Sequence, residues 1–121
     1  MPGKRPSTAF VKLDHSLLDS EAWLHLDPHA FKLLVAIWRR HTGKNNGGIP
    51  YSIREAMQLL GCGQHRAKAC FDELVGKGFL TIARESSFNI KSRVSREWAI
   101  TAVGDRGAQA SDAYQKWKAP T

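Results

Sequence analysis

The hydrophobic positions of residues 51–82 follow helical spacing twice and then change to the alternation of a strand. The first run covers residues 53–60, where apolar side chains recur every three or four positions and so share one helix face. Ser52 and Glu55 have the spacing of a capping box at its start, and Gly61 follows its end. We therefore predict a helix over 53–60 with a buried face made of Ile53, Ala56, Met57 and Leu60.

A second helix is predicted over residues 64–76, directly after a glycine-rich turn. The apolar side chains expected to face the first helix, with Cys70 at the margin, are Ala67, Phe71, Leu74 and Val75. The outward positions are polar and mostly basic: Gln64, His65, Arg66, Lys68, Ala69 and Asp72. An ordinary amphipathic surface helix would show this pattern. Two helices joined by a short turn are also typical of a helix-turn-helix, whose second helix enters the major groove of DNA.

The segment after the second helix predicts a β-hairpin. Gly78 can end the helix in the left-handed conformation, and residues 79–83 alternate as a half-buried strand does. Residues 95–101 alternate likewise, with Trp98 and Ile100 on one face. Basic and small polar residues fill the segment between the two strands, as in the wing of a winged helix. The expected fold class is α+β: a mainly helical winged helix-turn-helix with a β-hairpin wing and a short C-terminal helix.

Asp27 and Pro28 mark the start of a further helix. Aspartate caps a first turn well, and proline at the first helical position lacks only an N–H that has no partner there. We expect this helix to extend to about residue 41 and to be the most buried of the domain. The remaining elements are expected to be short: a helical turn or two in 14–26, a strand at 10–13, and an edge strand at 49–51 that pairs with the hairpin.

We expect the chain to divide into a flexible basic arm (1–9), a winged helix-turn-helix domain (10–103) and a C-terminal linker with a short helix (104–121). Four side chains of the last segment have helical spacing: Ala110, Ala113, Tyr114 and Trp117. The rings of Tyr114 and Trp117 would form an exposed apolar patch unless another part of the chain or a second subunit covered them. We expect this helix to join two subunits in a homodimer. The alternative is that it folds back onto its own domain near Trp23 or Trp38.

Composition and charge favour a polyanionic partner. The 121 residues contain 18 Lys and Arg against 11 Asp and Glu, with a formal charge of +7 and a pI near 9.8. Residues 39–68 are more basic than the chain average, with one acid, Glu55, against Arg39, Arg40, Lys44, Arg54, Arg66 and Lys68. The longest apolar run falls far short of the roughly 20 residues that span a bilayer. We therefore expect a cytoplasmic protein without a membrane partner.

The sequence lacks the patterns of enzymes and of metal sites. It contains no glycine-rich phosphate loop, nucleophile elbow or paired carboxylates, so we expect neither enzymatic activity nor a cofactor. Cys62, His65 and Cys70 lie close in sequence but lack the Cys-x-x-Cys spacing of zinc sites. On one helix His65 and Cys70 would point apart by about 140°. No metal site is expected.

Several short motifs, taken in order, carry a resemblance. They are Asn-Asn-Gly-Gly-Ile-Pro, Leu-Gly-Cys-Gly, Glu-Leu-Val-Gly-Lys-Gly-Phe-Leu, Ser-Phe-Asn-Ile-Lys, Arg-Glu-Trp-Ala-Ile-Thr and Ala-Tyr-Gln-Lys-Trp. Across residues 10–117 the chain resembles the small winged helix-turn-helix DNA-binding proteins of bacterial prophages and mobile elements. The resemblance implies a winged-helix DNA-binding domain, in a group that includes regulators and replication accessory proteins.

The expected function is sequence-specific binding of double-stranded DNA, in transcriptional or replication regulation of a mobile element. Base edges or nearby phosphates would be contacted by Gln64, His65, Arg66 and Lys68. The DNA backbone would be held at the start of the first helix by Ser52 and Arg54. The wing residues Lys91 and Arg93 would reach the flanking phosphates or the minor groove. The alternative is a winged-helix protein-interaction module that binds a partner protein rather than DNA.

Overall fold

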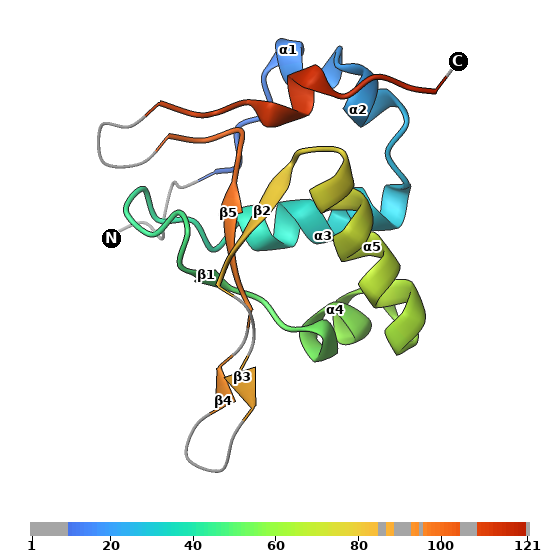
Figure 1. Ribbon diagram of the computed structural model, residues 1–121, viewed down its shortest axis with the longest axis vertical. Coiled ribbons are helices and arrows are strands. Elements are labelled where there is room, and N and C mark those ends of the chain that lie inside the picture. The colour runs from blue at the N-terminus through green and yellow to red at the C-terminus, as the bar shows by residue number, and fades with distance from the viewer. Residues whose placement is uncertain (1–9, 85–86, 89–92, 95, 105–108, 121) are drawn as a thin grey trace, which may run out of the picture.

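The fold is α+β. The computed structural model describes residues 10–84, 87–88, 93–94, 96–104 and 109–120 (Figure 1). In chain order the elements in these residues are α1 (His15–Leu18), α2 (Glu21–Leu24), α3 (Pro28–Trp38), β1 (Ile49–Pro50), α4 (Ile53–Leu60), α5 (Gln64–Gly76), β2 (Leu80–Arg84), β3 (Ser87–Phe88), β4 (Arg93–Val94), β5 (Glu97–Ile100) and the 3₁₀ helix η1 (Ala113–Lys116).

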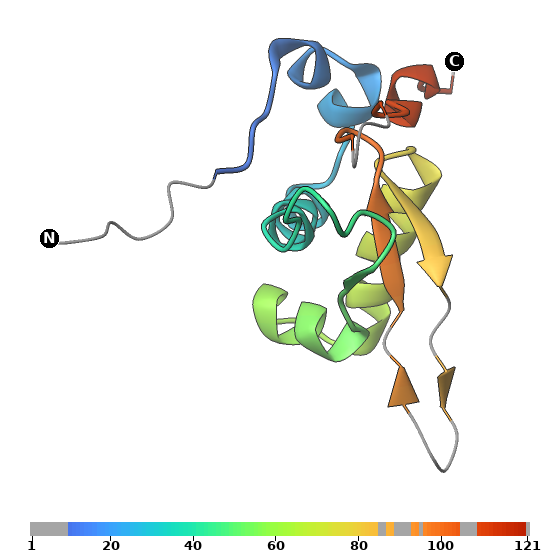
Figure 2. The ribbon, with the colours of Figure 1, turned by 90° about the vertical axis from the view of Figure 1, so that its left-hand side faces the viewer.

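The strands form a small antiparallel sheet with an extension. Its order is β1-β5-β2, and Trp98 of β5 stands opposite Ile49 on one side and Ile82 on the other. The short pair β3 and β4 lies beyond the far end of β2 and β5 (Figure 2). The edge strand expected at 49–51 and the hairpin expected after α5 are thus confirmed, apart from small differences in their ends.

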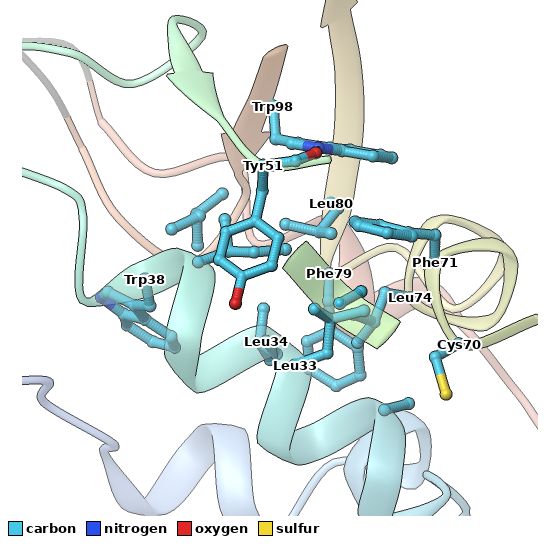
Figure 3. Packing of buried hydrophobic residues seen from close by; sticks show 14 of the residues in the cluster. Leu33, Leu34, Trp38, Tyr51, Cys70, Phe71, Leu74, Phe79, Leu80 and Trp98 are labelled. Carbon is cyan, nitrogen blue, oxygen red and sulfur yellow. The ribbon is translucent and has the colours of Figure 1, made fainter. Parts of the chain in front are cut away.

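The core lies where α3, α4 and α5 meet the sheet (Figure 3). Phe71 of α5 stacks on Trp98 of β5, with ring centroids 4.7 Å apart and an interplanar angle of 4°. Leu33, Leu34 and Ile37 of α3 are fully buried. Complete burial of a large apolar side chain contributes about 1.5–3 kcal/mol. The aromatic stack and the α3 leucines therefore fix α5 against both the sheet and α3.

Local signals set the bounds of α4 and α5, which match the predicted ranges. The backbone N–H of Glu55 donates to Ser52 Oγ (3.0 Å), and the backbone N–H of Ser52 donates to Glu55 Oε1 (3.0 Å), which completes the capping box. Gly61 (φ 64°) and Gly78 (φ 88°) take the left-handed conformation expected of them.

Helix α3 is shorter than predicted, because it ends at Trp38 rather than near residue 41. The N–H groups of Arg40 and His41 donate to the carbonyls of Ile37 (3.0 Å) and Trp38 (2.9 Å). Each bond spans three residues instead of four, so the α-helix is replaced by 3₁₀-type turns. The side chain of Asn45 then donates to the carbonyl of Arg40 (3.0 Å), an interaction with a later loop that the helical pattern does not contain.

Asn46 takes the place of a strand neighbour beside β5. Its Oδ1 accepts from the backbone N–H of Ile100 (2.7 Å), and its Nδ2 donates to the carbonyls of Ile100 (2.9 Å) and Val103 (3.3 Å). The next N–H, of Gly47, donates to the carbonyl of Trp98 (3.1 Å). The loop before β1 is therefore joined to the sheet through the Asn46 side chain and the Gly47 backbone N–H.

The amino-terminal part differs from expectation in one element. The expected strand at 10–13 is wrong: these residues form no strand in the described chain, and Phe10 is 79% exposed. The expected helical turns at 14–26 are confirmed as α1 and α2, which begin at side-chain caps from Asp14 and Ser20. A strand needs the open edge of another strand to pair with, and no described strand pairs with residues 10–13.

The C-terminal segment packs on its own domain. The helix expected over 110–117 is reduced to η1, because Asp112 before it has a φ of 51°. Tyr114 is buried and stacks on Phe79 with ring centroids 5.1 Å apart, and Trp117 lies 5.7 Å from the ring of His25. The aromatic side chains that suggested a dimer interface are thus largely used within the chain. Dimerisation stays a prediction without that support.

Taken together, the elements gather at two ends of the molecule. In both views α1, α2 and η1 lie at one end, and α4, the first turns of α5 and the β3–β4 pair lie at the other (Figures 1 and 2). None of the helices in the described ranges has the length and apolar character needed to cross a membrane.

Candidate nucleic-acid interface

The exposed face of α5 is polar. Its buried side consists of Ala67, Cys70, Phe71 and Leu74. Its exposed positions include all six residues predicted to face outward: Gln64, His65, Arg66, Lys68, Ala69 and Asp72. Cys70 is buried rather than marginal, and burial raises the pKa of its thiol. The outward orientation of the predicted contact residues is therefore confirmed, while their contact with DNA stays a prediction.

The amino-terminal turn of α5 has no side-chain cap. Gly63 stands at the N-cap position, and the N–H of Ala67 is the first that donates into the helix, to the carbonyl of Gly63 (3.1 Å). The N–H groups of residues 64–66 precede it and point out of the helix end. Such a turn attracts anions, since it combines free donors with the positive end of the helix dipole.

Lys68 and Asp72 form an ion pair on this exposed face. Lys68 Nζ lies 3.0 Å from Asp72 Oδ2, and the two side chains are 56% and 60% exposed. Solvent screens a pair this exposed, so it contributes little to folding stability. The pair nevertheless holds a donor and an acceptor side by side on α5.

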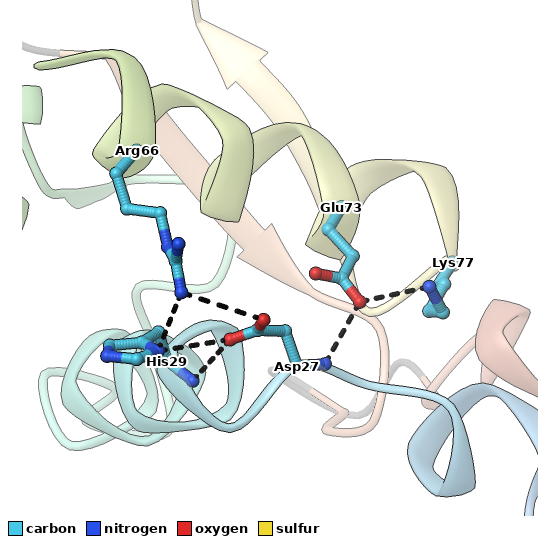
Figure 4. A network of polar contacts seen from close by, with 5 residues as sticks. All are labelled: Asp27, His29, Arg66, Glu73 and Lys77. Carbon is cyan, nitrogen blue, oxygen red and sulfur yellow. Dashed lines mark hydrogen bonds and ion pairs between the residues drawn. The ribbon is translucent and has the colours of Figure 1, made fainter.

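Arg66 points from α5 toward the start of α3 (Figure 4). Its Nη2 lies 3.1 Å from His29 Nδ1 and 3.9 Å from Asp27 Oδ2. Asp27 caps α3 through the N–H of His29 (2.7 Å), and this hydrogen bond, helped by the nearby Arg66, lowers the pKa of its carboxyl. Although it is exposed, the Arg66 side chain therefore already contacts residues at the start of α3.

Glu73 and Lys77 continue this network along α5. Glu73 Oε2 accepts from the backbone N–H of Asp27 (3.0 Å) and from Lys77 Nζ (3.0 Å) (Figure 4). The network links the start of α3 to two positions of α5, about two turns apart. Sequence reasoning missed it. The four-residue spacing of Glu73 and Lys77 was the available signal, but nothing local pointed to Asp27 as their partner.

At the start of α4 the two predicted contact residues differ. Ser52 Oγ both accepts from the N–H of Glu55 and donates to its carboxylate, so this hydroxyl already serves the capping box. Arg54 is exposed and forms no ion pair with any described residue. Of the two, Arg54 is the side chain available to a ligand.

Glu55 also binds Arg40, an interaction that was not predicted. Arg40 Nη2 donates to Glu55 Oε2 (2.6 Å), its Nη1 donates to the carbonyl of Pro50 (2.7 Å), and its guanidinium carbon lies 4.3 Å from the ring centre of Tyr51. The hydrogen bond from Arg40 is the main cause that holds the pKa of Glu55 below its ordinary value. Arg40 therefore acts within the fold, joining the end of α3 to the start of α4.

We expect Glu55→Gln to lower the free energy of unfolding by about 1 kcal/mol near pH 7, a value kept small by solvent screening. The pKa of Glu55 is lower in the folded state. Its contribution is therefore present above the unfolded pKa and is lost as the pH falls through the folded pKa. Urea unfolding of both proteins should show a difference near pH 7 that shrinks as the pH falls through the folded pKa of Glu55.

An Arg40→Gln background provides the control, because it removes the hydrogen bond that lowers the pKa of Glu55. In that background Glu55→Gln should have a smaller effect near neutral pH. The same pH dependence in both backgrounds would contradict the assigned partner.

The two predicted wing residues are described only in part. Lys91 lies outside the described residues. Arg93 belongs to β4, where it stands opposite Phe88 of β3, and its side chain is not described. The hairpin position of Arg93 agrees with the prediction, and the contacts of both residues stay predictions.

Among the described residues, no three His, Cys, Asp or Glu side chains come together in a way that could hold a metal ion. Cys62 and Cys70 are free thiols. Comparison of the chain with models of known families, with curated proteins and with solved structures found no match.

Proposed function

We propose that this chain is a winged helix-turn-helix protein that binds double-stranded DNA, with α5 as the recognition helix and the β3–β4 extension as the wing. One observation carries the proposal: the exposed polar face and uncapped first turn of α5 lie at the same end of the molecule as the start of α4 and the hairpin (Figure 1). Winged helices use these three elements together on a duplex.

The exposed side chains suggest a division of contacts. Gln64, His65 and Lys68 are directed to base edges in the major groove. Arg54 and the open N–H groups of α5 are directed to phosphates. Lys91 and Arg93 are assigned to flanking phosphates or the minor groove. Ser52 and Arg66 are given a smaller part in DNA contact than predicted, because Ser52 already caps α4 and Arg66 already contacts His29 of α3.

A regulatory role in transcription or replication of a mobile element is what the resemblance of the sequence motifs implies, and the cytoplasm is the proposed location. A homodimer on paired half-sites would suit that role. Because the aromatic side chains of the C-terminal segment pack inside the chain, such a dimer would use another surface.

Salt dependence tests the DNA-binding proposal. Fluorescence anisotropy with a duplex of about 20 base pairs, titrated between about 50 and 200 mM salt, should show affinity falling steeply. Arg54→Ala should reduce the slope of log affinity against log salt by about one unit, the loss of one phosphate contact.

Lys118→Ala is the matched control, because it removes one positive charge at the opposite end of the molecule, where Lys118 faces Glu21 at 3.6 Å. Its slope should equal that of the unaltered chain. The absence of measurable duplex binding, or equal slopes for the Arg54 and Lys118 variants, would count against DNA binding through this face.

The protein-interaction alternative has an observation in its favour. Arg40, Arg66 and Lys68 each pair with a carboxylate, so half of the six basic residues in 39–68 are already neutralised. A partner protein bound to such a surface would give an affinity with little dependence on salt. The anisotropy experiment separates the two functions, because only DNA binding releases condensed counterions.

A further inference from the structure

The exposed face of α5 carries one carboxylate where a DNA-binding surface would be expected to be wholly basic or neutral. Asp72 lies on the same side of the helix as His65 and Ala69, and all three are exposed. Its neighbour Glu73 is turned toward α3, where it binds the backbone of Asp27. Asp72 is thus the acid of α5 that would meet the DNA.

Asp72 does not stand alone, because Lys68 Nζ lies 3.0 Å from its Oδ2. Both side chains are more than half exposed, so the pair adds little to stability. A carboxylate on a helix that approaches DNA is repelled by the phosphates and gains only from hydrogen-bond donors. Asp72 would therefore interact favourably with DNA only if the DNA offered it a hydrogen-bond donor.

The major groove offers carboxylates a donor in the exocyclic amino group of cytosine, and it offers lysine the O6 and N7 acceptors of guanine. In one G·C base pair these groups lie side by side at the groove edge. A donor and an acceptor held 3.0 Å apart on one helix face match that arrangement.

We propose that Lys68 and Asp72 together read a single G·C base pair, with Lys68 donating to guanine and Asp72 accepting from the amino group of cytosine. This inference rests on the proposed DNA-binding function and assigns its specificity. Before DNA binds, Lys68 and Asp72 are paired with each other. On binding, each side chain would replace part of this contact by a hydrogen bond to a base.

Selection of bound sequences from random duplexes tests this directly. The unaltered chain should show one position where G·C is preferred by about 5- to 150-fold, the range of a good base contact. Asp72→Asn and Lys68→Ala should each weaken the preference at that same position to less than about 3-fold, with the other positions unchanged. Asparagine should shift it toward A·T, because its amide suits adenine.

Asp19→Asn is the control for charge. It removes one negative charge from an exposed residue at the C-terminal end of α1, at the opposite end of the molecule. It should leave every base preference unchanged. Unfolding of each variant in urea shows whether it is folded under the selection conditions.

Three results would overturn the inference while leaving DNA binding intact. They are an A·T preference of the unaltered chain at the position that the variants affect, effects of the two variants at different positions, and uniform weakening by Lys68→Ala without change in preference. If the unaltered chain selects no duplex sequence at all, the proposed function fails together with this inference.

Discussion

Replacement of Gly78 by alanine should lower the free energy of unfolding by about 3 kcal/mol. About 1 kcal/mol comes from a side chain in the left-handed conformation and about 2 kcal/mol from overpacking. A Cβ at this position would lie 2.9 Å from the carbonyl carbon of Ala113 and 2.9 Å from the backbone nitrogen of Tyr114. Both are backbone atoms, so the C-terminal segment cannot yield by a change of rotamer. Urea unfolding measures the loss.

Two other glycines separate the causes. At Gly76 an added Cβ meets nothing within 4 Å and φ is not positive, so alanine there should be neutral or slightly stabilising. At Gly61 the backbone is left-handed (φ 64°) but the space is open, so alanine should lower stability by about 1 kcal/mol. Equal losses at Gly61 and Gly78 would show that the C-terminal segment does not pack closely on this turn.

A chain that ends at Val103 should be less stable than the full chain by about 3 kcal/mol or more. It loses the ring of Tyr114, which is 2% exposed and stacks on Phe79, and it loses the hydrogen bond from the N–H of Asp112 to the carbonyl of Thr101 (2.8 Å). Removal of a buried aromatic side chain costs about 3–5 kcal/mol in a well-packed core. Thermal and urea unfolding of the two chains test the difference.

A point variant and a shorter truncation make the comparison specific. Tyr114→Phe keeps the stacked ring and should remain close to the full chain in stability. A chain that ends at Trp117 keeps the Tyr114 stack and loses the contacts of Lys118 and Ala119 with the Glu21 carboxylate, so it should lose less stability than the chain that ends at Val103. Sedimentation of the same samples reports the dimer expectation, since a dimer held by this segment would dissociate when it is removed. If the chain ending at Val103 were as stable as the full one, the packing of Tyr114 would contribute nothing.

The elements that could be predicted are those with their own start and stop signals. The capping box of Ser52 and Glu55 and the left-handed Gly61 lie within a few residues of the helix that they delimit. Strand β5 follows from alternation, because its inner side chains Trp98 and Ile100 must reach one core. Strand β2 was found in the predicted place, but its burial does not alternate: Leu80 is buried and Ile82 is 38% exposed. These signals are local, and local signals are fully present in a sequence.

The elements that could not be predicted depend on contacts between distant residues. The stripe of Tyr114 and Trp117 has helical spacing, yet the segment is a 3₁₀ turn, and its rings contact Phe79, His25 and Lys77 of the same chain. Periodicity shows that a face is apolar and leaves open whether a second chain or the same chain covers it.

The same distinction between local signals and contacts of distant residues applies to the candidate interface. The outward face of α5 could be predicted, because helical geometry places residues relative to a buried side. The occupation of Arg66 by α3 could not, since its partners Asp27 and His29 are more than thirty residues away in sequence. Basic residues were counted as available charge, whereas three of them turned out to be paired.

Asn46 and Gly47 form an Asn-Gly sequence, the sequence at which proteins lose amide groups most readily with age. The reaction needs the glycine nitrogen to attack the side-chain carbonyl carbon of the asparagine. Here that nitrogen donates to the carbonyl of Trp98 (3.1 Å), while the asparagine amide is held by the backbone of β5. Deamidation must therefore await local opening of the loop. Its product would set a carboxylate against the carbonyls of Ile100 and Val103, so a molecule that opened long enough to react would not close in the same way again.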